Sequence, residues 1–255
     1  MSEMIELEMN DGIATLRLSR PPANALDLPF ITELAHAFAE LENRGDVRAL
    51  IVTGAGRFFS AGLDLKAVPT YGREEQRALA TNLNRMVGRL YGLSLPVVAA
   101  VNGHCIAGGV IVALSCDYRV GAAGDYKIGL TEARVGVVFP VAPMAVVQSE
   151  LSHPAARRAV LLARNVGPQE ALAEGMLDEL QPEERLLARA TEIAEEMASL
   201  PRTAYGRIKR QMRAAALARI DDAVNNDREP VLDSWLGEET ASASAQVLAR
   251  DRSKE

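Results

Sequence analysis

The sequence predicts an α/β fold in which helices flank a largely parallel β-sheet. Apolar segments of strand length alternate with helical patterns of ten or more residues through the first half of the chain. Such segments need crossover connections, which are typical of parallel sheets. The 255 residues are 48% hydrophobic and 24% charged, as in an ordinary globular protein. Because no compositional break marks a linker, we expect one α/β core without a separate second domain.

The chain is expected to open with a β-hairpin, a helix and a strand. Apolar and polar residues alternate over 5–9, Asp11-Gly12 has the composition of a tight turn, and a second strand covers 13–18. A helical spacing of apolar residues over 29–43 then precedes a short buried strand over 49–53. The opening order is therefore β-β-α-β.

A second unit of the same kind follows. Helical spacing over 73–91 leads into an apolar strand over 96–101, and a short helix is expected over 108–116. Two further strands are predicted over 117–120 and 126–129. Alternation of this kind predicts a sheet with its helices outside.

Beyond Pro143 the pattern is helical and we expect strands to have ended. Helices are predicted over 145–151, 154–163, 168–174, 183–200 and 203–218, with two more segments ending near residue 250. We therefore divide the chain by role into a core of residues 1–195 and a helical region of residues 196–255. That region is expected to pack on the core and on neighbouring subunits.

Composition excludes several functions. The 28 Lys and Arg against 34 Asp and Glu give a formal net charge of −6, so no nucleic-acid partner is expected. The longest apolar run, 95–101, is far shorter than the roughly 20 residues of a membrane span. Cys105 and Cys116 are not spaced as metal ligands, and the acidic N-terminus does not have the pattern of a targeting peptide. We expect a cytoplasmic protein with reduced thiols.

Common nucleotide, hydrolase and metal motifs are missing from the sequence. Gly54-Ala55-Gly56 lacks the third glycine of a dinucleotide loop. His36, His104 and His153 have no partner at ligand spacing, so each is interpreted as a surface or packing residue. No metal site is expected.

Two glycine-marked turns each follow a buried strand. They are Ser-Ala-Gly-Leu-Asp-Leu at 60–65 and Asn-Gly-His-Cys-Ile-Ala-Gly-Gly at 102–109. In the second, Gly108-Gly109 opens a helix, whose free N–H groups and positive dipole end favour an anion. The residues alone support tight packing of the helix on the sheet equally well.

The two turns resemble motifs of the crotonase superfamily, the enoyl-CoA hydratase and isomerase group. Arg-Pro-Pro-Ala-Asn-Ala-Leu at 20–26 and the helix-turn segment 168–178 resemble that family too, so the likeness covers essentially the whole chain. It implies a crotonase-like spiral of ββα units with a helical C-terminal oligomerisation region. It also implies a coenzyme A thioester as substrate, no permanently bound cofactor, and a homotrimer or a dimer of trimers.

The resemblance assigns the site residue by residue. The N–H groups of Leu63 and Gly108 would form an oxyanion hole for the thioester carbonyl. The expected substrate and coenzyme A contacts are Ala23, Ala25, Leu26, Ala61, Gly62, Asp64, Leu65, Ile111 and Thr131. Arg20 and Lys66 are the nearest candidate partners of the phosphates. Asp64 is expected to fix its own turn.

One catalytic carboxylate is present where hydratases of the family have two. The position of the first glutamate, three residues beyond Gly108, is occupied by Ile111. The second matches Glu132 in Gly129-Leu-Thr-Glu132. This pattern is similar to that of mitochondrial-type 3,2-trans-enoyl-CoA isomerases. The resemblance implies that a single glutamate moves a proton from C2 to C4. An apolar Ile111 beside Glu132 would raise the pKa of the carboxyl.

Several alternatives stay open. Glu132 could be a surface residue paired with Arg134, and Thr131 could contact substrate or cap a turn. Hydration or another crotonase reaction is the second functional hypothesis, and a non-catalytic acyl-CoA-binding protein is the third. Asp117 is interpreted as a local turn cap. Acyl-chain length stays unknown, because the pocket walls expected from 71–91 and 137–147 do not reveal a volume.

The apolar residues of the predicted tail are interpreted as core or subunit packing. They are Ile208, Met212, Ala215, Ala216, Val231, Leu232, Trp235 and Leu236.

Overall fold

The structure is a computed structural model that describes residues 4–226 and residue 235. Its strands are β1 Ile5–Asn10, β2 Ile13–Leu18, β3 Ala49–Gly54, β4 Phe58–Ser60, β5 Val97–Val101, β6 His104–Ile106, β7 Tyr118–Ala122, β8 Ile128–Gly129 and β9 Glu179–Gln181. They form a six-stranded sheet in the order β1-β2-β3-β5-β7-β9 and a three-stranded sheet in the order β4-β6-β8. The predicted α/β class with a largely parallel sheet is confirmed, although the strands divide between two sheets.

The first two strands form the predicted hairpin. β1 and β2 pair antiparallel, with Asn10 opposite Ile13. Asp11 and Gly12 both have positive φ, 45° and 79°, as a tight hairpin turn requires. Every later pairing within the two sheets is parallel.

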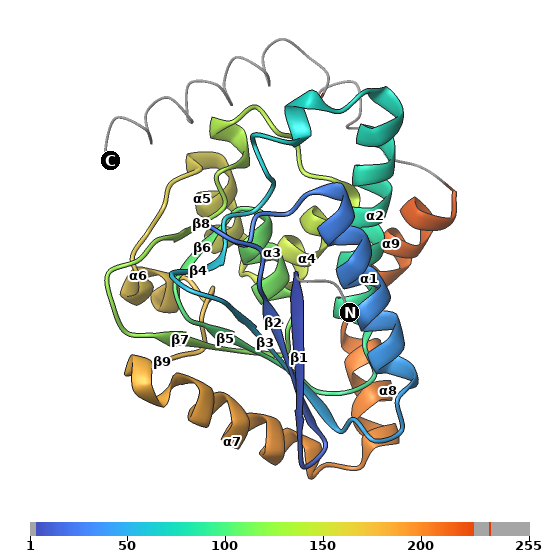
Figure 1. Ribbon diagram of the computed structural model, residues 1–255, viewed down its shortest axis with the longest axis vertical. Helices are drawn as coiled ribbons and strands as arrows, with labels where there is room; N and C mark the ends of the chain where they lie inside the picture. The colour runs from blue at the N-terminus through green and yellow to red at the C-terminus, as the bar shows by residue number, and fades with distance from the viewer. Residues whose placement is uncertain (1–3, 227–234, 236–255) are drawn as a thin grey trace.

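Helices surround the sheets (Figure 1). They are α1 Leu28–Asn43, α2 Arg73–Gly92, α3 Gly108–Leu114, α4 Val141–Glu150, α5 His153–Leu162, α6 Pro168–Ala173, α7 Leu186–Ala198, α8 Arg202–Met212 and α9 Ala214–Asn225, with short 3₁₀ turns η1 Val68–Thr70, η2 Glu132–Arg134 and η3 Glu183–Arg185. α7 packs across β3, β5 and β7, while the smaller sheet lies on the other side of the large one (Figure 1). Buried apolar side chains from both sheets and the helices form one continuous core.

Two expectations about the second half of the chain were wrong. β9 lies beyond Pro143 and pairs parallel with β7, so strands do not end there. A three-residue strand is too short to show a period of its own. The helix predicted over 203–218 is divided at Arg213 into α8 and α9. Arg213 is buried and its guanidinium donates to the carbonyl oxygens of Tyr91 and Cys116.

Asp117 is not a local turn cap. Its carboxylate accepts the N–H of Val97, 20 residues earlier in the chain, and the Tyr205 hydroxyl. It also pairs with Lys209 at 2.7 Å and with Arg213 at 3.0 Å. This buried carboxylate therefore joins the start of β5 to α8 and to the junction between α8 and α9.

The described part of the helical tail packs on the core of the same chain. α9 lies against α2 and α4, and Trp235 is buried, with its indole N–H donating to the Val138 carbonyl at 2.8 Å. Ile208 and Met212 are 55% and 81% exposed, so neither belongs to the core of the single chain. The predicted packing residues Val231, Leu232 and Leu236 lie outside the described residues.

The division of the chain at residue 195 stays a prediction. Among the described residues, no helix has the length and apolar character to cross a membrane.

Candidate active site

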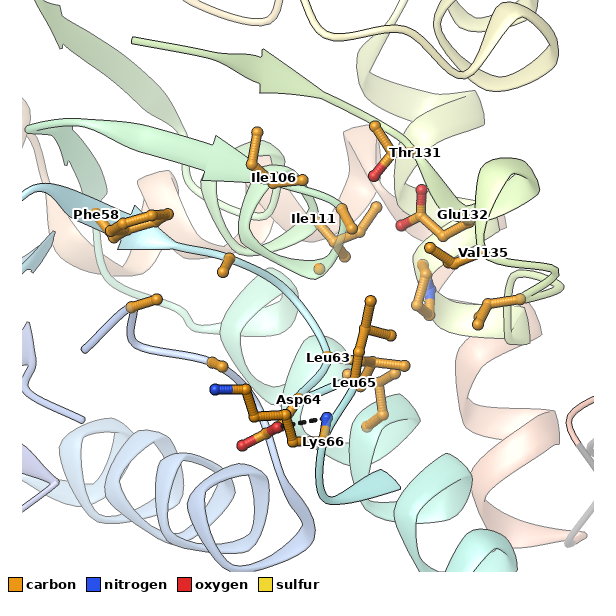
Figure 2. Close-up of a pocket in the computed structure, with 18 of the residues that line it drawn as sticks. Phe58, Leu63, Asp64, Leu65, Lys66, Ile106, Ile111, Thr131, Glu132 and Val135 are labelled. Carbon is orange, nitrogen blue, oxygen red and sulfur yellow. Dashed lines mark hydrogen bonds between the residues drawn. The ribbon is translucent and has the colours of Figure 1, made fainter. Parts of the chain in front are cut away.

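A cavity of about 740 Å³ lies where the β4 turn, the start of α3 and the segment after β8 meet (Figure 2). One group of its lining residues comes from the 20–25 loop and the 61–66 turn, and the other from Ile111, the 131–143 segment, Leu83 and Trp235. The walls are mainly apolar; Asp64 and Lys66 lie at the first end, and the Glu132 carboxylate lies at the other (Figure 2). This shape suits an elongated ligand with a polar and an apolar end.

The turn after β4 holds one free N–H group in a fixed direction. Leu26 donates its N–H to the Gly62 carbonyl at 2.7 Å and accepts the N–H of Asp64 at 2.9 Å. Since the C=O and N–H of a trans peptide point in opposite directions, the Leu63 N–H points away from Leu26. It makes no hydrogen bond to another described residue.

The start of α3 supplies a second free N–H beside the first. Ala107 precedes the helix with φ of 50°, a strained conformation for a residue with a side chain. The N–H of Gly108 makes no hydrogen bond within the described residues. A Cβ placed on Gly62 would lie 2.9 Å from the Gly108 nitrogen, so the two turns touch. Leu63 and Gly108 both line the cavity.

Most of the predicted substrate contacts line the cavity, and two do not. Ala23, Ala25, Ala61, Asp64, Leu65, Ile111 and Thr131 are lining residues. Leu26 and Gly62 are absent from the lining. Leu26 is fully buried and packs against Gly108, and the absence of a side chain at Gly62 leaves room for the Ala107 side chain. These two residues therefore contribute to the packing of the two turns and do not form part of the cavity surface.

Glu132 is the buried carboxylate of the cavity. It opens η2, is 7% exposed, and lies near Ile111, Thr131 and Val135 in Figure 2. Its Oε2 atom has no hydrogen-bond partner among the described residues. Burial raises the pKa of Glu132 to about 8. A desolvated carboxyl with one oxygen lacking a partner and a pKa near neutrality suits a general base.

The environment of Glu132 is not that of a surface ion pair. Arg134 forms no ion pair with it and donates instead to the Ala163 carbonyl. Ile111 is 1% exposed and presents an apolar side chain to the cavity. The interpretation of Glu132 as a surface glutamate paired with Arg134 is therefore wrong.

The two basic residues at the other end differ in their surroundings. The Arg20 guanidinium contacts Asp27 at 2.7 Å and Asp64 at 2.9 Å. Although burial opposes it, the amides of Lys66 and Ala67 and the Arg20 guanidinium hold the pKa of Asp64 below its usual value. The exposed Lys66 ammonium has no ion-pair partner among the described residues.

Metal and thiol chemistry find no support among the described residues. They contain no cluster of three or more His, Cys, Asp or Glu side chains that could hold a metal ion. Cys105 and Cys116 are both buried, and burial raises the pKa of each thiol. His104 stacks on Phe58 and accepts the Lys127 N–H, so it is a packing residue.

Several lining residues were not predicted from the sequence. Phe58 and Ile106 come from the short strands β4 and β6, and Trp235 comes from the tail. Val135 and Asn165 follow Glu132 and α5, respectively. Phe58 and Ile106 lie beside or within the two glycine-marked turns that the sequence singled out. No local pattern could place Trp235 at the cavity.

The sequence of the chain is similar to those of known proteins from one family. The family model described as enoyl-CoA hydratase/isomerase matches residues 8–240. The human mitochondrial enoyl-CoA delta isomerase 1 is 32% identical over 246 residues, 96% of this chain and 81% of that protein. An Escherichia coli carnitinyl-CoA dehydratase is 30% identical over 236 residues, 92% of this chain and 90% of that protein.

Solved structures agree with this result. The crystal structure of human mitochondrial delta3-delta2-enoyl-CoA isomerase superposes with a TM-score of 0.89 at 32% identity, covering 99% of each chain. An enoyl-CoA hydratase from Mycobacterium ulcerans gives a TM-score of 0.82 at 31% identity, covering 92% of this chain and all of that one. The spiral fold expected from the motifs is therefore confirmed.

Proposed function

The chain belongs to the enoyl-CoA hydratase/isomerase family of enzymes, and we propose that it converts 3-enoyl-CoA to trans-2-enoyl-CoA. The main support for this proposal is the buried carboxylate of Glu132, which lies beside the apolar Ile111 in the cavity (Figure 2). Isomerisation needs one group that takes and returns a proton. Hydration also needs a water molecule to be held and activated, for which the motif-matched partner position offers no polar atom.

The reaction is a proton transfer through a dienolate. Ionised Glu132 removes a proton from C2, and the electron pair spreads over the thioester oxygen, C2 and C4. The N–H groups of Leu63 and Gly108 stabilise the charge on the oxygen, each worth about 3–4 kcal/mol. Protonated Glu132 then returns the proton to C4, which leaves the double bond between C2 and C3. Atoms and charge balance without any added reactant.

Burial of Glu132 assists both proton transfers. Desolvation makes the carboxylate a stronger base, and a pKa of about 8 leaves its acid form accessible at neutral pH. Water is excluded by the apolar wall, so the dienolate is more readily reprotonated on carbon by Glu132.

The remaining assignments follow the two ends of the cavity. We propose that the 20–25 loop and the 61–66 turn contact coenzyme A, with the exposed Lys66 near a phosphate. The acyl chain would then lie among Leu83, Pro143 and Trp235. A homotrimer or a dimer of trimers, and a cytoplasmic location, remain part of this proposal.

Hydration of 2-enoyl-CoA is the second candidate. The relationship to a carnitinyl-CoA dehydratase and to a structure described as an enoyl-CoA hydratase supports it. In that case Glu132 would have to activate the water molecule without help, because Ile111 occupies the position where hydratases of the family have another glutamate.

Turnover of the two thioesters separates the candidates. The protein is supplied with 3-enoyl-CoA and, separately, with 2-enoyl-CoA of the same chain length. We expect fast isomerisation and slow hydration. Glu132→Gln should lower isomerisation about 10²- to 10⁴-fold while acyl-CoA binding persists.

A matched variant controls for the loss of a carboxylate. Glu183→Gln changes an exposed glutamate of η3 that does not line the cavity, and this variant should keep full activity. Fast hydration without isomerisation would replace the first candidate by the second. Binding without any turnover would support the non-catalytic hypothesis.

A further inference from the structure

The Arg20 guanidinium is enclosed by acceptors at the cavity wall. Its Nη1 donates to the Ala25 carbonyl at 2.9 Å, and its Nη2 donates to Asp27 at 2.7 Å and to Asp64 at 2.9 Å. The side chains of Arg20, Asp27 and Asp64 are only 22%, 13% and 16% exposed. Hydrogen bonds between such partly buried charged groups are among the stronger polar contacts in proteins. The contacts therefore fix the guanidinium in one place.

Its three acceptors flank the two residues of one β-bridge. Leu26 and Leu63 form an isolated parallel bridge between the first loop and the β4 turn. Ala25 and Asp27 are the neighbours of Leu26, and Asp64 is the neighbour of Leu63. The guanidinium thus joins both sides of this bridge.

The carboxylate of Asp64 is itself held rigidly. Its Oδ1 accepts the N–H groups of Lys66 at 2.9 Å and Ala67 at 3.1 Å, which leaves Oδ2 for the guanidinium of Arg20. Asp27 is fixed in the same way, because its Oδ1 caps α1 through the Phe30 N–H. Arg20 therefore connects two anchored carboxylates, one on each side of the bridge.

We propose that Arg20 is a positioning residue for the oxyanion hole. By holding the bridge in register it fixes the Gly62–Leu63 peptide plane, and with it the direction of the Leu63 N–H. This inference rests on the proposed role of Leu63 as a donor to the thioester oxygen. It replaces the expectation that Arg20 binds a coenzyme A phosphate, because both of its terminal nitrogens already contact protein acceptors.

The two roles of Arg20 predict different kinetics. A residue that binds a coenzyme A phosphate affects only substrates that carry the nucleotide, and loss of that residue raises their KM. A positioning residue acts on the carbonyl, so its loss lowers kcat equally for substrates with and without the nucleotide. A 3-enoyl-CoA and the matching 3-enoyl-pantetheine thioester provide this pair.

The experiment compares three variants on both thioesters. Arg20→Met should lower kcat about 10- to 100-fold on each, since a donor misplaced by about 1 Å can cost 10²-fold. Lys66→Met should raise KM for the CoA thioester and leave the pantetheine thioester unchanged. Arg158→Met, which removes an arginine paired with Glu174 on the surface, is the matched control and should keep wild-type activity.

A spectroscopic measurement makes the test independent of the reaction. Binding of unreactive butyryl-CoA should shift the thioester carbonyl band in infrared difference spectra of the wild type, Lys66→Met and Arg158→Met, and the shift should shrink in Arg20→Met. This readout stays valid if the enzyme proves to be a hydratase. If butyryl-CoA bound with no carbonyl shift in the wild type, the oxyanion hole itself would be refuted.

A second substitution protects against misfolding of Arg20→Met. Asp64→Asn should reproduce the loss of kcat and the smaller band shift, and the double variant should be no worse than either single one. Arg20→Lys should recover part of the activity. A loss confined to the CoA thioester, or an unchanged carbonyl band in a folded Arg20→Met, would overturn the proposal.

Discussion

Glu132 is a carboxyl group placed where its ionised form is poorly solvated. With no partner for Oε2 and 7% of the residue exposed, the folded protein favours the protonated acid. The pKa is raised from 4.5 to about 8. A glutamate in this state costs stability at neutral pH, and such costs are typical of functional sites. The sequence motif pointed to this residue, but only the enclosure explains its pKa.

The raised pKa links stability to pH with a definite sign. Because the folded pKa lies above the unfolded one, the contribution of Glu132 is fully favourable below about pH 4.5 and is lost as pH rises toward about 8. Glu132→Gln should therefore unfold at a higher temperature than the wild type above about pH 5, with the difference growing up to pH 8. Thermal unfolding scans across this range check it. A difference that does not change with pH would contradict the raised pKa.

The same pKa predicts how activity depends on pH. The base must be ionised in the free enzyme, so kcat/KM for 3-enoyl-CoA should rise with pH and level off above about pH 8. Ile111→Ala, which opens the wall beside the carboxyl, should move this rise to lower pH. An unshifted profile in that variant would exclude Ile111 as the source of the desolvation.

The positions of the two turns that carry Leu63 and Gly108 depend on each other. Gly62 has φ of 77°, and a Cβ there would lie 2.8–2.9 Å from Ala107 Cβ, Ile106 O and Gly108 N. The two turns that carry the free N–H groups can therefore approach each other this closely only because position 62 lacks a side chain. The turn after β4 and the start of α3 together form the proposed oxyanion hole.

Gly62→Ala should separate the turns and lower kcat about 10²- to 10³-fold, the loss of one oxyanion donor. Gly175→Ala is the matched control, because Gly175 has φ of 78° but open space around it and does not line the cavity. Both variants should lose roughly 1 kcal/mol or more of stability from the positive φ. Steady-state kinetics and denaturant unfolding distinguish them. Equal kinetic losses in the two variants would contradict the role of the Gly62 contact.

Sequence patterns predicted the long elements well because each carries its own period. The hairpin, α1, α2, β3 and β5 all lie within a few residues of their expected bounds. The strands β4, β6 and β9 have three residues each and take their form from partners distant in the chain, so local patterns could not find them. The motifs located Leu63, Gly108 and Glu132 in one cavity, whereas the proposed task of Arg20 required the contacts themselves.

A buried charge cluster attaches the C-terminal helices α8 and α9 to the large sheet. Asp117 contacts Lys209 and Arg213, and Arg213 also reaches Glu150 of α4 at 3.4 Å. The α4 helix carries the cavity residue Pro143. The position of the cavity wall at Pro143 therefore depends on contacts between α4 and the junction of α8 and α9.

Asp117→Asn should destabilise the protein by about 3–5 kcal/mol, because it leaves buried Lys209 without a carboxylate partner and buried Arg213 with only the longer contact to Glu150. Adding Lys209→Met should recover part of this loss, since one unpaired charge is then removed. Denaturant unfolding measures both changes. Unchanged stability in Asp117→Asn would show that the cluster does not hold the helices.

In the proposed mechanism one carboxylate moves one proton between two carbons, and isotope transfer from C2 to C4 follows that proton. 3-Enoyl-CoA deuterated at C2 is converted in ordinary water, and the first product is analysed by mass spectrometry and NMR. Because Glu132 is buried among apolar walls, we predict that a measurable fraction of the product carries deuterium at C4. Product with only solvent hydrogen at C4 from the first turnover would contradict the single-carboxylate mechanism.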